Sequence, residues 1–470
     1  MTGGICNGKD KIGYLPFFIK LYDEEDPYYR DPLVLYMNKL IAMLESRGIE
    51  VIPADEICRV KEEFDRAAEK FNRLDVDAVV TQHLAYCPSL GAVDALLSLK
   101  MPIVIFDTTV DYGTLAVQNY KNCLRPNHGI HGVQDLCNML IRNGRDFSLC
   151  VGHTSHGDVL DRVVSCCRAA KIAKTLKNAR IGSVGGAFEG MGDFQVTEER
   201  LKAEIGAEII KLSPEIAEKY LSAVTEEEID AEIALEREKY DVRVKNTGDY
   251  RESTRSGLAM RKWIDENRLC GCTVNFLKVK DGGLPKMPFN ECCKMLERGI
   301  GYAGEGDVLT AGLAGALFSV FHDTAFVEMF IPDWENGLIL LSHMGESNPA
   351  LAKFRPIVAD KPFGYNGTGD TVSMVTCMRA GNAVLVNLAP MKEGFRLILS
   401  PVTMTDDGLE RGAYEYVNRG WMKPALPLQD FLADYSEAGG THHSALVYGG
   451  DLKTLSEFGK MCGFEVTVIK

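Results

Sequence analysis

The chain has 470 residues, more than one ordinary hydrophobic core can organise, so we expect two or three domains. It carries 66 Asp and Glu against 52 Lys and Arg, which gives a formal net charge of -14. An acidic balance without a basic block excludes a nucleic-acid partner and favours a small soluble substrate.

The apolar runs and the cysteines indicate a cytoplasmic protein. The N-terminal segment MTGGICNGKDKIGYLPFF lacks the charged, apolar and small-residue regions of a secretory signal. No run of 18 or more apolar residues occurs, so we expect neither a membrane span nor a membrane partner. The 14 cysteines are scattered or adjacent, as in Cys166-Cys167, which favours reduced core thiols over disulfides.

The first third alternates short apolar runs with amphipathic stretches. The segments KIGYLPFF, IEVIPA, VDAVVTQ and MPIVIFD are typical of strands, and helical patterns over 33–48 and 61–72 separate them. A further strand, ARIGSVGG from Ala179, opens a second such block. The acidic region from Ser213-Pro214 to Tyr240 is most simply a solvated helix face with a loop. This alternation predicts βαβ units with parallel sheets.

From about Phe326 the sequence pattern changes to strands rich in β-branched residues, which Gly and Pro separate at short intervals. The strands are NGLILLSH, NAVLVNLAP, FRLILSPVTM, HSALVYGG and FEVTVIK. We therefore predict an N-terminal α/β domain over residues 1–170, a central α/β domain over 171–325 and a C-terminal antiparallel β domain over 326–470.

Carboxylates and imidazoles gather in four segments of the last third, GYAGEGD, FVEMF, LLSHMGE and GGTHHS. They supply Glu305, Glu328, His343 and the pair His442-His443, the residue types that a divalent cation with mixed oxygen and nitrogen preference selects. Glu328 stands in the apolar run TAFVEMFIP, where an ionised carboxylate needs a compensating positive charge. A metal ion would supply that charge, although a lone Glu or His is more often a capping or core group.

These four segments resemble, in order and separation, the metal-site segments of the L-arabinose isomerases, within the L-arabinose and L-fucose isomerase superfamily. The resemblance extends to NHGIHGVQD at 127–135, to HLAYCPS at 83–89 and to GGAFEGMGDF at 185–194. It implies two Rossmann-like parallel-sheet domains followed by an antiparallel β-barrel-like domain. It also implies a metal-dependent aldose-ketose isomerase.

Carried over by position, the resemblance implies Mn²⁺, or another divalent cation such as Co²⁺ or Mg²⁺, held by four ligands. These ligands are Glu305, Glu328, His343 and His443. His442 lies beside them, and the resemblance implies that His131 reaches the active site of a neighbouring subunit in a homohexamer. The residues expected to shape the sugar pocket are Tyr86, Phe188, Met191, Phe276 and Met344.

The departures from the family concern specificity. Gly345 stands where the family usually has Leu, and the segment YLPFFIKLYDEEDP lacks the expected Gln-His motif. We therefore expect the reaction class to be shared while the sugar can differ.

The expected mechanism moves a proton between C1 and C2 of the sugar through an enediolate. Glu305 and Glu328 would divide the acid and base roles, and a metal-assisted hydride shift would use the same residues. Exchange of label between C2 and water separates the two schemes.

Three other functions compete with this one. A nucleotide-dependent oxidoreductase would use Gly182, Gly185 and Gly186, but their spacing is not G-x-G-x-x-G. A silent sugar-binding homologue has no physical need for two carboxylates at one site. A metal-dependent aldolase or hydrolase lacks an evident nucleophile, because Cys87 and Ser444 are better interpreted as packing or turn residues.

Overall fold

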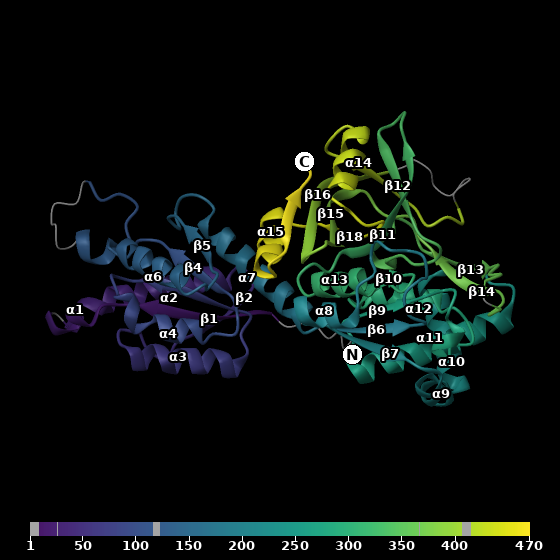
Figure 1. Cartoon of the computed structure of the whole chain (residues 1–470), viewed down its shortest axis with the longest axis horizontal. Coiled ribbons are helices and arrows are strands. Elements are labelled where there is room, and N and C mark those ends of the chain that lie inside the picture. Colours follow the sequence, from purple (N-terminus) through teal and green to yellow (C-terminus); the bar gives the residue numbers. More distant parts are fainter. Residues whose placement is uncertain (1–8, 26, 116–122, 366, 407–414) are drawn as a thin grey trace. The chain divides into compact units, whose positions relative to one another are not determined.

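The computed structural model describes residues 9–25, 27–115, 123–365, 367–406 and 415–470. The chain forms two compact units, an N-terminal unit that ends at Lys174 and a C-terminal unit from Thr175 to Lys470. Figure 1 labels the helices and strands of both. Within the described ranges, no helix combines the length and the apolar character that crossing a membrane requires.

The N-terminal unit is built on a parallel sheet with the order β2-β1-β3-β4-β5. Helix α3 shows how the sequence covers this sheet, because Phe64, Ala67, Ala68 and Phe71 recur at helical spacing and are buried. The strands are β1 (Asp10–Phe17), β2 (Ile49–Pro53), β3 (Ala78–His83), β4 (Ile103–Asp107) and β5 (Ser148–Val151). The helices are α1 (Lys20–Glu25), α2 (Asp31–Glu45), α3 (Lys61–Leu74), α4 (Val93–Leu97), α6 (Ile130–Arg142) and α7 (Val159–Lys177), with 3-10 turns at Pro27–Arg30, Ser89–Gly91 and Arg125–Asn127.

The C-terminal unit begins with a second parallel sheet, of order β10-β9-β6-β7. Its strands are β6 (Arg180–Val184), β7 (Glu208–Leu212), β9 (Gly271–Val274) and β10 (Gly301–Gly304). The helices of this region are α8 (Glu198–Glu204), α9 (Pro214–Ser222), α10 (Glu226–Lys239), α11 (Thr247–Asn267), α12 (Phe289–Glu297) and α13 (Val308–Phe318), with a 3-10 turn at Lys280–Gly282. Loops that leave the carboxyl ends of such strands are the usual place for ligands in parallel sheets.

The rest of this unit contains a closed barrel in which the strands pair in the order β15-β18-β11-β12-β17-β16, and β16 pairs back onto β15. The barrel core includes Leu341, Leu385, Ile398, Met422 and Leu446. The strands are β11 (Thr324–Asp333), β12 (Leu338–Ser342), β15 (Gly381–Pro390), β16 (Phe395–Thr405), β17 (Gly420–Pro424) and β18 (His443–Tyr448). Helices α14 (Leu428–Glu437) and α15 (Leu452–Met461) and a 3-10 turn at Pro349–Leu351 complete the region.

Two smaller features adjoin the barrel. Strand β19 (Glu465–Val468) pairs parallel to β16, so the prediction of antiparallel pairing was wrong at this edge. A short sheet of order β14-β13-β8 is formed by β8 (Asp241–Val242), β13 (Ile357–Lys361) and β14 (Thr371–Val375).

Helix α13 lies between the central sheet and the barrel. Every one of its residues is buried, as expected for the sequence VLTAGLAGALF, which is apolar on all faces. It contacts β9 and β10 of the sheet and also β11 and β18 of the barrel. The sheet and the barrel are therefore held against one helix, which is separated from the end of β10 only by residues 305–307.

The parallel-sheet α/β domains and the closed antiparallel barrel confirm the predicted fold class. The boundaries at 170 and 325 stay predictions, because the central sheet and the barrel belong to the same compact unit. No disulfide joins the cysteines of the described ranges, and most of these thiols are buried.

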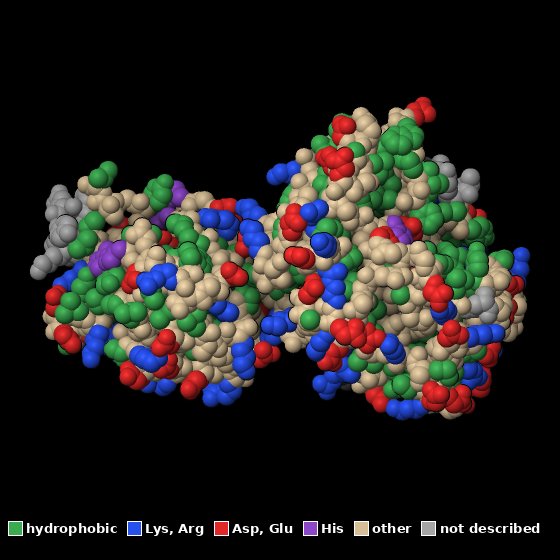
Figure 2. Space-filling view, viewed as in Figure 1, with side chains coloured by type: hydrophobic (Ala, Val, Ile, Leu, Met, Phe, Trp, Pro, Cys, Tyr) green, Lys and Arg blue, Asp and Glu red, His purple; other side chains and the backbone are tan. Residues whose placement is uncertain are grey.

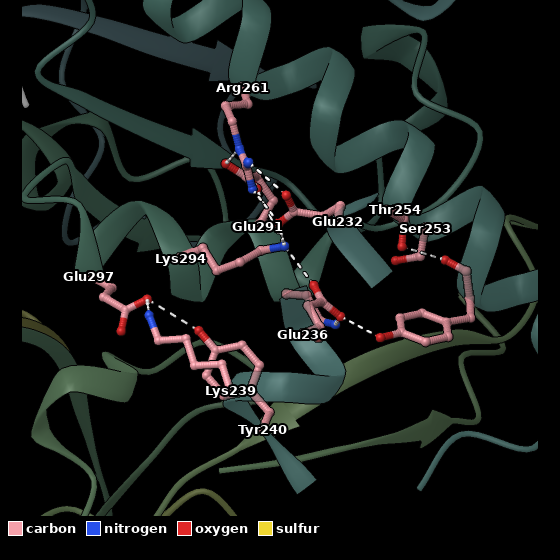
Figure 3. Close-up of polar contacts among 12 residues, drawn as sticks. Glu232, Glu236, Lys239, Tyr240, Ser253, Thr254, Arg261, Glu291, Lys294 and Glu297 are labelled. Atoms are coloured by element: carbon pink, nitrogen blue, oxygen red, sulfur yellow. Dashed lines mark hydrogen bonds and ion pairs between the residues drawn. The ribbon is translucent and has the colours of Figure 1, made fainter. Parts of the chain in front are cut away.

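The acidic helix α10 differs from its prediction as a solvated face. Glu232 and Glu236 are buried, and Lys294 lies 2.6 Å from a carboxylate oxygen of each (Figure 3). Arg261 joins Glu232 to Glu291, which is 2% exposed. The prediction was wrong for these carboxylates because cations of α11 and α12, distant in the sequence, compensate their burial.

Replacing Lys294 with Met should destabilise the fold by about 3 kcal/mol or more, because the buried carboxylates of Glu232, Glu236 and Glu291 lose a shared cation. The matched control is Lys239→Met, since the half-exposed Lys239 pairs with Glu297 and such pairs contribute about 0–1 kcal/mol. Urea denaturation of both variants measures the difference. Equal losses would show that the buried network contributes no more than a surface pair.

The histidine that ends β3 should make the stability of the N-terminal unit depend on pH. His83 is 4% exposed and stacks on Phe17 with ring centroids 4.5 Å apart. Neither ring nitrogen has a hydrogen-bond partner within the described residues, and burial lowers the pKa of His83 to about 3. The ring is therefore neutral when folded, and its protonation favours unfolding.

Because the folded pKa lies below the unfolded value, this stability is present above about pH 6.5 and is lost as the pH falls toward 3. Between pH 6.5 and 5 the free energy of unfolding should fall by up to about 1.4 kcal/mol for each pH unit. In His83→Leu this dependence on pH should be weaker. Hydrogen exchange of β1 and β3, corrected for the intrinsic pH effect, measures it. A parallel decline in both proteins would contradict this role for His83.

Candidate active site

The candidate site begins at the carboxyl end of β10, where Glu305 and Gly306 turn the chain into α13. Glu305 has a φ of 63°, in the left-handed region that favours glycine, and its side chain is 12% exposed. Gly304 precedes it, and a Cβ there would lie 2.7 Å from Cε1 of His343. The absence of a side chain at Gly304 therefore lets His343 approach Glu305.

Three neighbouring barrel strands bring the other predicted ligands to the same place. Glu328 on β11 lies opposite His443 on β18 and opposite Ser342 on β12, directly before His343. Cross-strand partners on one face lie close enough to interact. Nε2 of His343 is accordingly 3.8 Å from Oε2 of Glu328.

His443 is fully buried and is oriented by Asp307, the N-cap residue of α13. Its Nδ1 donates to Oδ2 of Asp307 at 3.0 Å, while Oδ1 of Asp307 accepts from the backbone of Thr310. Nε2 of His443 lies 3.5 Å from Oε2 of Glu305 and makes no hydrogen bond within the described residues. A buried nitrogen left in this way is suited to ligation of a cation, and a carboxylate behind it fixes the ring.

His343 has a corresponding arrangement. Its Nδ1 donates to Oε2 of Glu346 at 2.7 Å, and Glu346 also accepts from the Tyr302 hydroxyl and the Gly345 backbone, each at 2.9 Å. Burial alone would raise the pKa of Glu346, but the charge and hydrogen bond of His343 outweigh it and lower that pKa. Glu346 is therefore held as an anion behind His343.

His442 is the third imidazole and is the most exposed, with 31% of its side chain accessible. Its Nδ1 donates to Oδ2 of Asp193 at 2.6 Å, and its Nε2 lies 3.5 Å from Oε2 of Glu305. All three imidazoles thus have a carboxylate at Nδ1 and a glutamate facing Nε2.

The two glutamates differ in their surroundings. Burial raises the pKa of Glu305, but the neighbouring imidazoles of His442 and His443 outweigh it and bring the pKa to about 2. Burial raises the pKa of Glu328 above its ordinary value. Burial lowers the pKa of His443, but Asp307 and Glu305 outweigh it and raise the pKa to about 9. A cation that replaced the His443 proton would find two carboxylates already in place.

These residues form two overlapping groups in which one potential ligand atom from each member lies within 4.8 Å of the others. One group is Glu328, His343 and His443, and the other is Glu305, His442 and His443. Mixed carboxylate and imidazole ligands suit a cation that accepts both oxygen and nitrogen, such as manganese or cobalt, so the donor set fits the predicted Mn²⁺. The ligand roles themselves stay predictions.

Several residues predicted to contact the sugar adjoin this centre. The backbone N–H of Phe188 donates to the Glu305 carbonyl at 2.9 Å, and the ring of Phe188 lies 5.7 Å from that of Phe276. Met344 follows His343 and is partly buried, as is Met191 in the loop of Phe188. Figure 2 shows histidine and acidic side chains surfacing together beside hydrophobic ones on the unit that contains the barrel.

An aromatic side chain and a lysine that no sequence motif marks also lie beside these residues. Tyr365 is 48% exposed, and its ring lies 5.5 Å from that of Phe276. Lys361 donates to the Met344 carbonyl at 2.5 Å. Lys361 is the last residue of β13, and Tyr365 follows that strand. The sequence pattern alone does not distinguish them from ordinary turn residues.

His131 and Tyr86 lie in the N-terminal unit. Their rings stack with centroids 4.4 Å apart, and His131 also stacks on His128 at 4.9 Å. The predicted contribution of His131 and Tyr86 to a site stays a prediction.

The carboxylates that orient the imidazoles were also missed by sequence reasoning. Each of them lies within three residues of a predicted site residue. They are Asp193 in GMGDF, Asp307 in GEGD and Glu346 in HMGE. An acidic residue near a ligand was the available signal. Its partner could not be read, because Asp193 and His442 are 249 positions apart.

Two family models match adjoining parts of the chain. The model of the L-arabinose isomerase central domain matches residues 188–322, and that of the C-terminal domain matches residues 323–465. Together they cover more than half of the 470 residues.

Curated relatives cover more of the chain. The L-arabinose isomerase of Herpetosiphon aurantiacus is 25% identical over 81% of this chain and 78% of its own length. That of Clostridium beijerinckii is 26% identical over 83% and 80%, and that of Oceanobacillus iheyensis is 24% identical over 89% of each. These matches support the arabinose isomerase part of the resemblance and add no support for its L-fucose isomerase part.

Replacing Glu346 with Gln should weaken Mn²⁺ binding about 10- to 100-fold, because the amide keeps the shape but removes the charge behind His343. Isothermal titration calorimetry with MnCl₂ measures the change. Glu189→Gln is the control, since Glu189 is exposed and pairs only with Lys278 in the described contacts. Equal affinities of Glu346→Gln and the unmodified protein would refute a role for Glu346 behind a metal ligand.

Proposed function

The chain belongs to the L-arabinose isomerase family, and from that premise we propose that it is a metal-dependent enzyme that interconverts a small free aldose and its ketose. The reaction is an intramolecular oxidation and reduction between C1 and C2. One observation carries the metal-dependent part of this proposal. Glu305 and Glu328 face the Nε2 atoms of three imidazoles, and each imidazole has a carboxylate at Nδ1.

Glu305, Glu328, His343 and His443 would hold the cation, with Mn²⁺ as the first choice and Co²⁺ or Mg²⁺ as substitutes. When bound, a divalent cation acts as a Lewis acid on carbonyl and hydroxyl oxygens. Asp307 and Glu346 keep the two ligating imidazoles in orientation, which supports a fixed site over one assembled by the substrate.

The two glutamates divide the proton transfers. One carboxylate takes the proton from C2 of the aldose, and the other moves the proton between the hydroxyl and carbonyl oxygens, so that an enediolate forms and collapses to the ketose. Return of the proton to C1 completes the exchange without loss of atoms. His442, the most exposed imidazole, lies beside Glu305 on the side that a sugar can reach.

The sugar would lie against aromatic and thioether side chains and not against a dedicated phosphate site. Phe188, Phe276 and Tyr365 offer partly exposed rings next to one another, and such rings stack on the C–H faces of sugars. Met191 and Met344 would complete the pocket. Gly345 and the entry segment YLPFFIKLYDEEDP, where the chain departs from the family, are the places to expect a changed sugar preference.

We also propose that the enzyme is a homohexamer in which His131 and Tyr86 of one copy complete the site of another. The exposed His131 follows Ile130, which is 45% exposed, and an apolar and imidazole surface of this kind supports burial against a second copy. Size-exclusion chromatography with light scattering tests the assembly. A monomer that is fully active would contradict this part.

An aldose-to-ketose conversion screen with and without Mn²⁺ tests the central proposal. The sugars are L-arabinose, L-fucose, D-arabinose, L-ribulose, D-galactose and rarer pentoses and tetroses. We expect Mn²⁺-dependent turnover of at least one of them, and a loss of at least about 100-fold in Glu305→Gln and in Glu328→Gln, because each variant loses a proton-transfer group. The amount of ketose, or of aldose for L-ribulose, is the measurement.

Deuterium incorporation from solvent at C1 of the ketose, or at C2 of recovered aldose, is the mechanistic control. Exchange supports the enediolate route, and turnover without any exchange would replace it with a hydride shift between C2 and C1. No turnover of any sugar by a folded protein that binds Mn²⁺ would instead favour another carbonyl substrate or a silent homologue.

A further inference from the structure

The loop after β6, residues 185–194, reaches from the central sheet to the barrel and contacts both halves of the candidate site. Its Phe188 backbone N–H donates to the Glu305 carbonyl. A Cβ on Gly306 would lie 2.2 Å from the Gly186 carbonyl oxygen, so the two segments pack backbone to backbone. At its other end the loop carries Asp193 and Phe194 beside the barrel histidines.

Asp193 holds His442 at two points through a single oxygen. Its Oδ2 accepts from the His442 backbone N–H at 2.9 Å and from Nδ1 of the same residue at 2.6 Å. The backbone hydrogen bond fixes the main chain of His442, and the Nδ1 hydrogen bond fixes its ring. The two bonds are therefore compatible with one orientation of the imidazole. In that orientation Nε2 lies 3.5 Å from Oε2 of Glu305.

The residue after Asp193 fixes the position of the loop. Phe194 is 1% exposed, and its ring stacks on His443 with centroids 5.2 Å apart and planes 11° apart. It also lies 5.5 Å from the ring of His442. The buried ring therefore anchors the chain next to the two histidines, and Asp193 has little freedom to move away from His442.

Asp193 differs in one respect from the other two carboxylates that orient an imidazole. Asp307 and Glu346 are buried, with 0% and 3% of the residue exposed, and they lie behind the proposed metal ligands. The side chain of Asp193 is 39% exposed, and the histidine that it holds is the one that solvent and a sugar can reach. Its position is suited to the substrate side of the site and not to retention of the metal.

We infer that Asp193 is a positioning residue of the isomerase reaction, which fixes His442 with Nε2 beside Glu305, where the sugar oxygens are handled. This inference rests on the proposed function. It assigns to the loop 185–194 a role beyond shaping the pocket, because the same segment contacts Glu305 through Phe188 and sets the orientation of His442 through Asp193.

Steady-state kinetics of Asp193→Ala, with the sugar that the screen identifies, tests the inference. We expect kcat to fall about 10- to 100-fold while the Mn²⁺ content per chain stays unchanged, because no proposed ligand is touched. Asp193→Asn, which keeps an acceptor oxygen, should lose less. Glu208→Gln, at the exposed start of β7 and paired with Lys202, should keep the parent kcat.

A double-mutant cycle separates positioning from a general structural effect. If Asp193 acts through His442, Asp193→Ala should cause no further loss of kcat in a His442→Ala background. An equal loss in both backgrounds would overturn the inference, as would loss of Mn²⁺ from the single variant.

The position of the ring provides a readout that does not depend on turnover. In a crystal structure of Asp193→Ala without sugar, the His442 ring should leave its place beside Glu305, whereas it should stay there in Glu208→Gln. A ring that stays in place in Asp193→Ala refutes the inference. If the parent protein converts no aldose but the ring moves as expected, the isomerase proposal fails while the orienting role of Asp193 stands.

Discussion

The site depends on the burial of one helix on all sides. Because α13 has no polar face, it must be covered by the central sheet on one side and by the barrel on the other. Only Glu305, Gly306 and Asp307 separate β10 from this helix, so Glu305 and Asp307 lie next to the barrel strands that carry Glu328 and His443. The need to bury α13 thus fixes how far Glu305 and Asp307 lie from the polar residues of the barrel strands.

The polar residues are then held by bonds that point away from the reacting centre. Each imidazole uses Nδ1 for a carboxylate, and each carboxylate accepts a further hydrogen bond: Asp307 from Thr310, Glu346 from Tyr302, and Asp193 from the His442 backbone. An orientation set in this way exists before any cation or sugar arrives, so little rearrangement accompanies binding. The cost of burying the acidic groups is met locally by their imidazole partners.

Much of the fold could be read from the sequence, because apolar spacing repeats locally. The runs that became β1, β3, β15 and β18 and the helices α2 and α3 were all predicted. The barrel was expected only from the family resemblance. The parallel edge strand β19 and the burial of Glu232 and Glu236 were not predicted, since each depends on partners far along the chain. The candidate ligands were found through four motifs, but Asp193, Asp307 and Glu346 required the geometry that joins those motifs.

The left-handed backbone at Glu305 has a consequence for how this chain can diverge. A side chain other than Gly, Asn or Asp in that region costs about 1–3 kcal/mol, so the fold alone would favour another residue there. A glutamate at this position persists only while selection on the carboxylate outweighs that cost. In a descendant that has lost the chemistry, drift at this position toward glycine should precede visible change in the surrounding strands, which makes this position an early marker of lost activity.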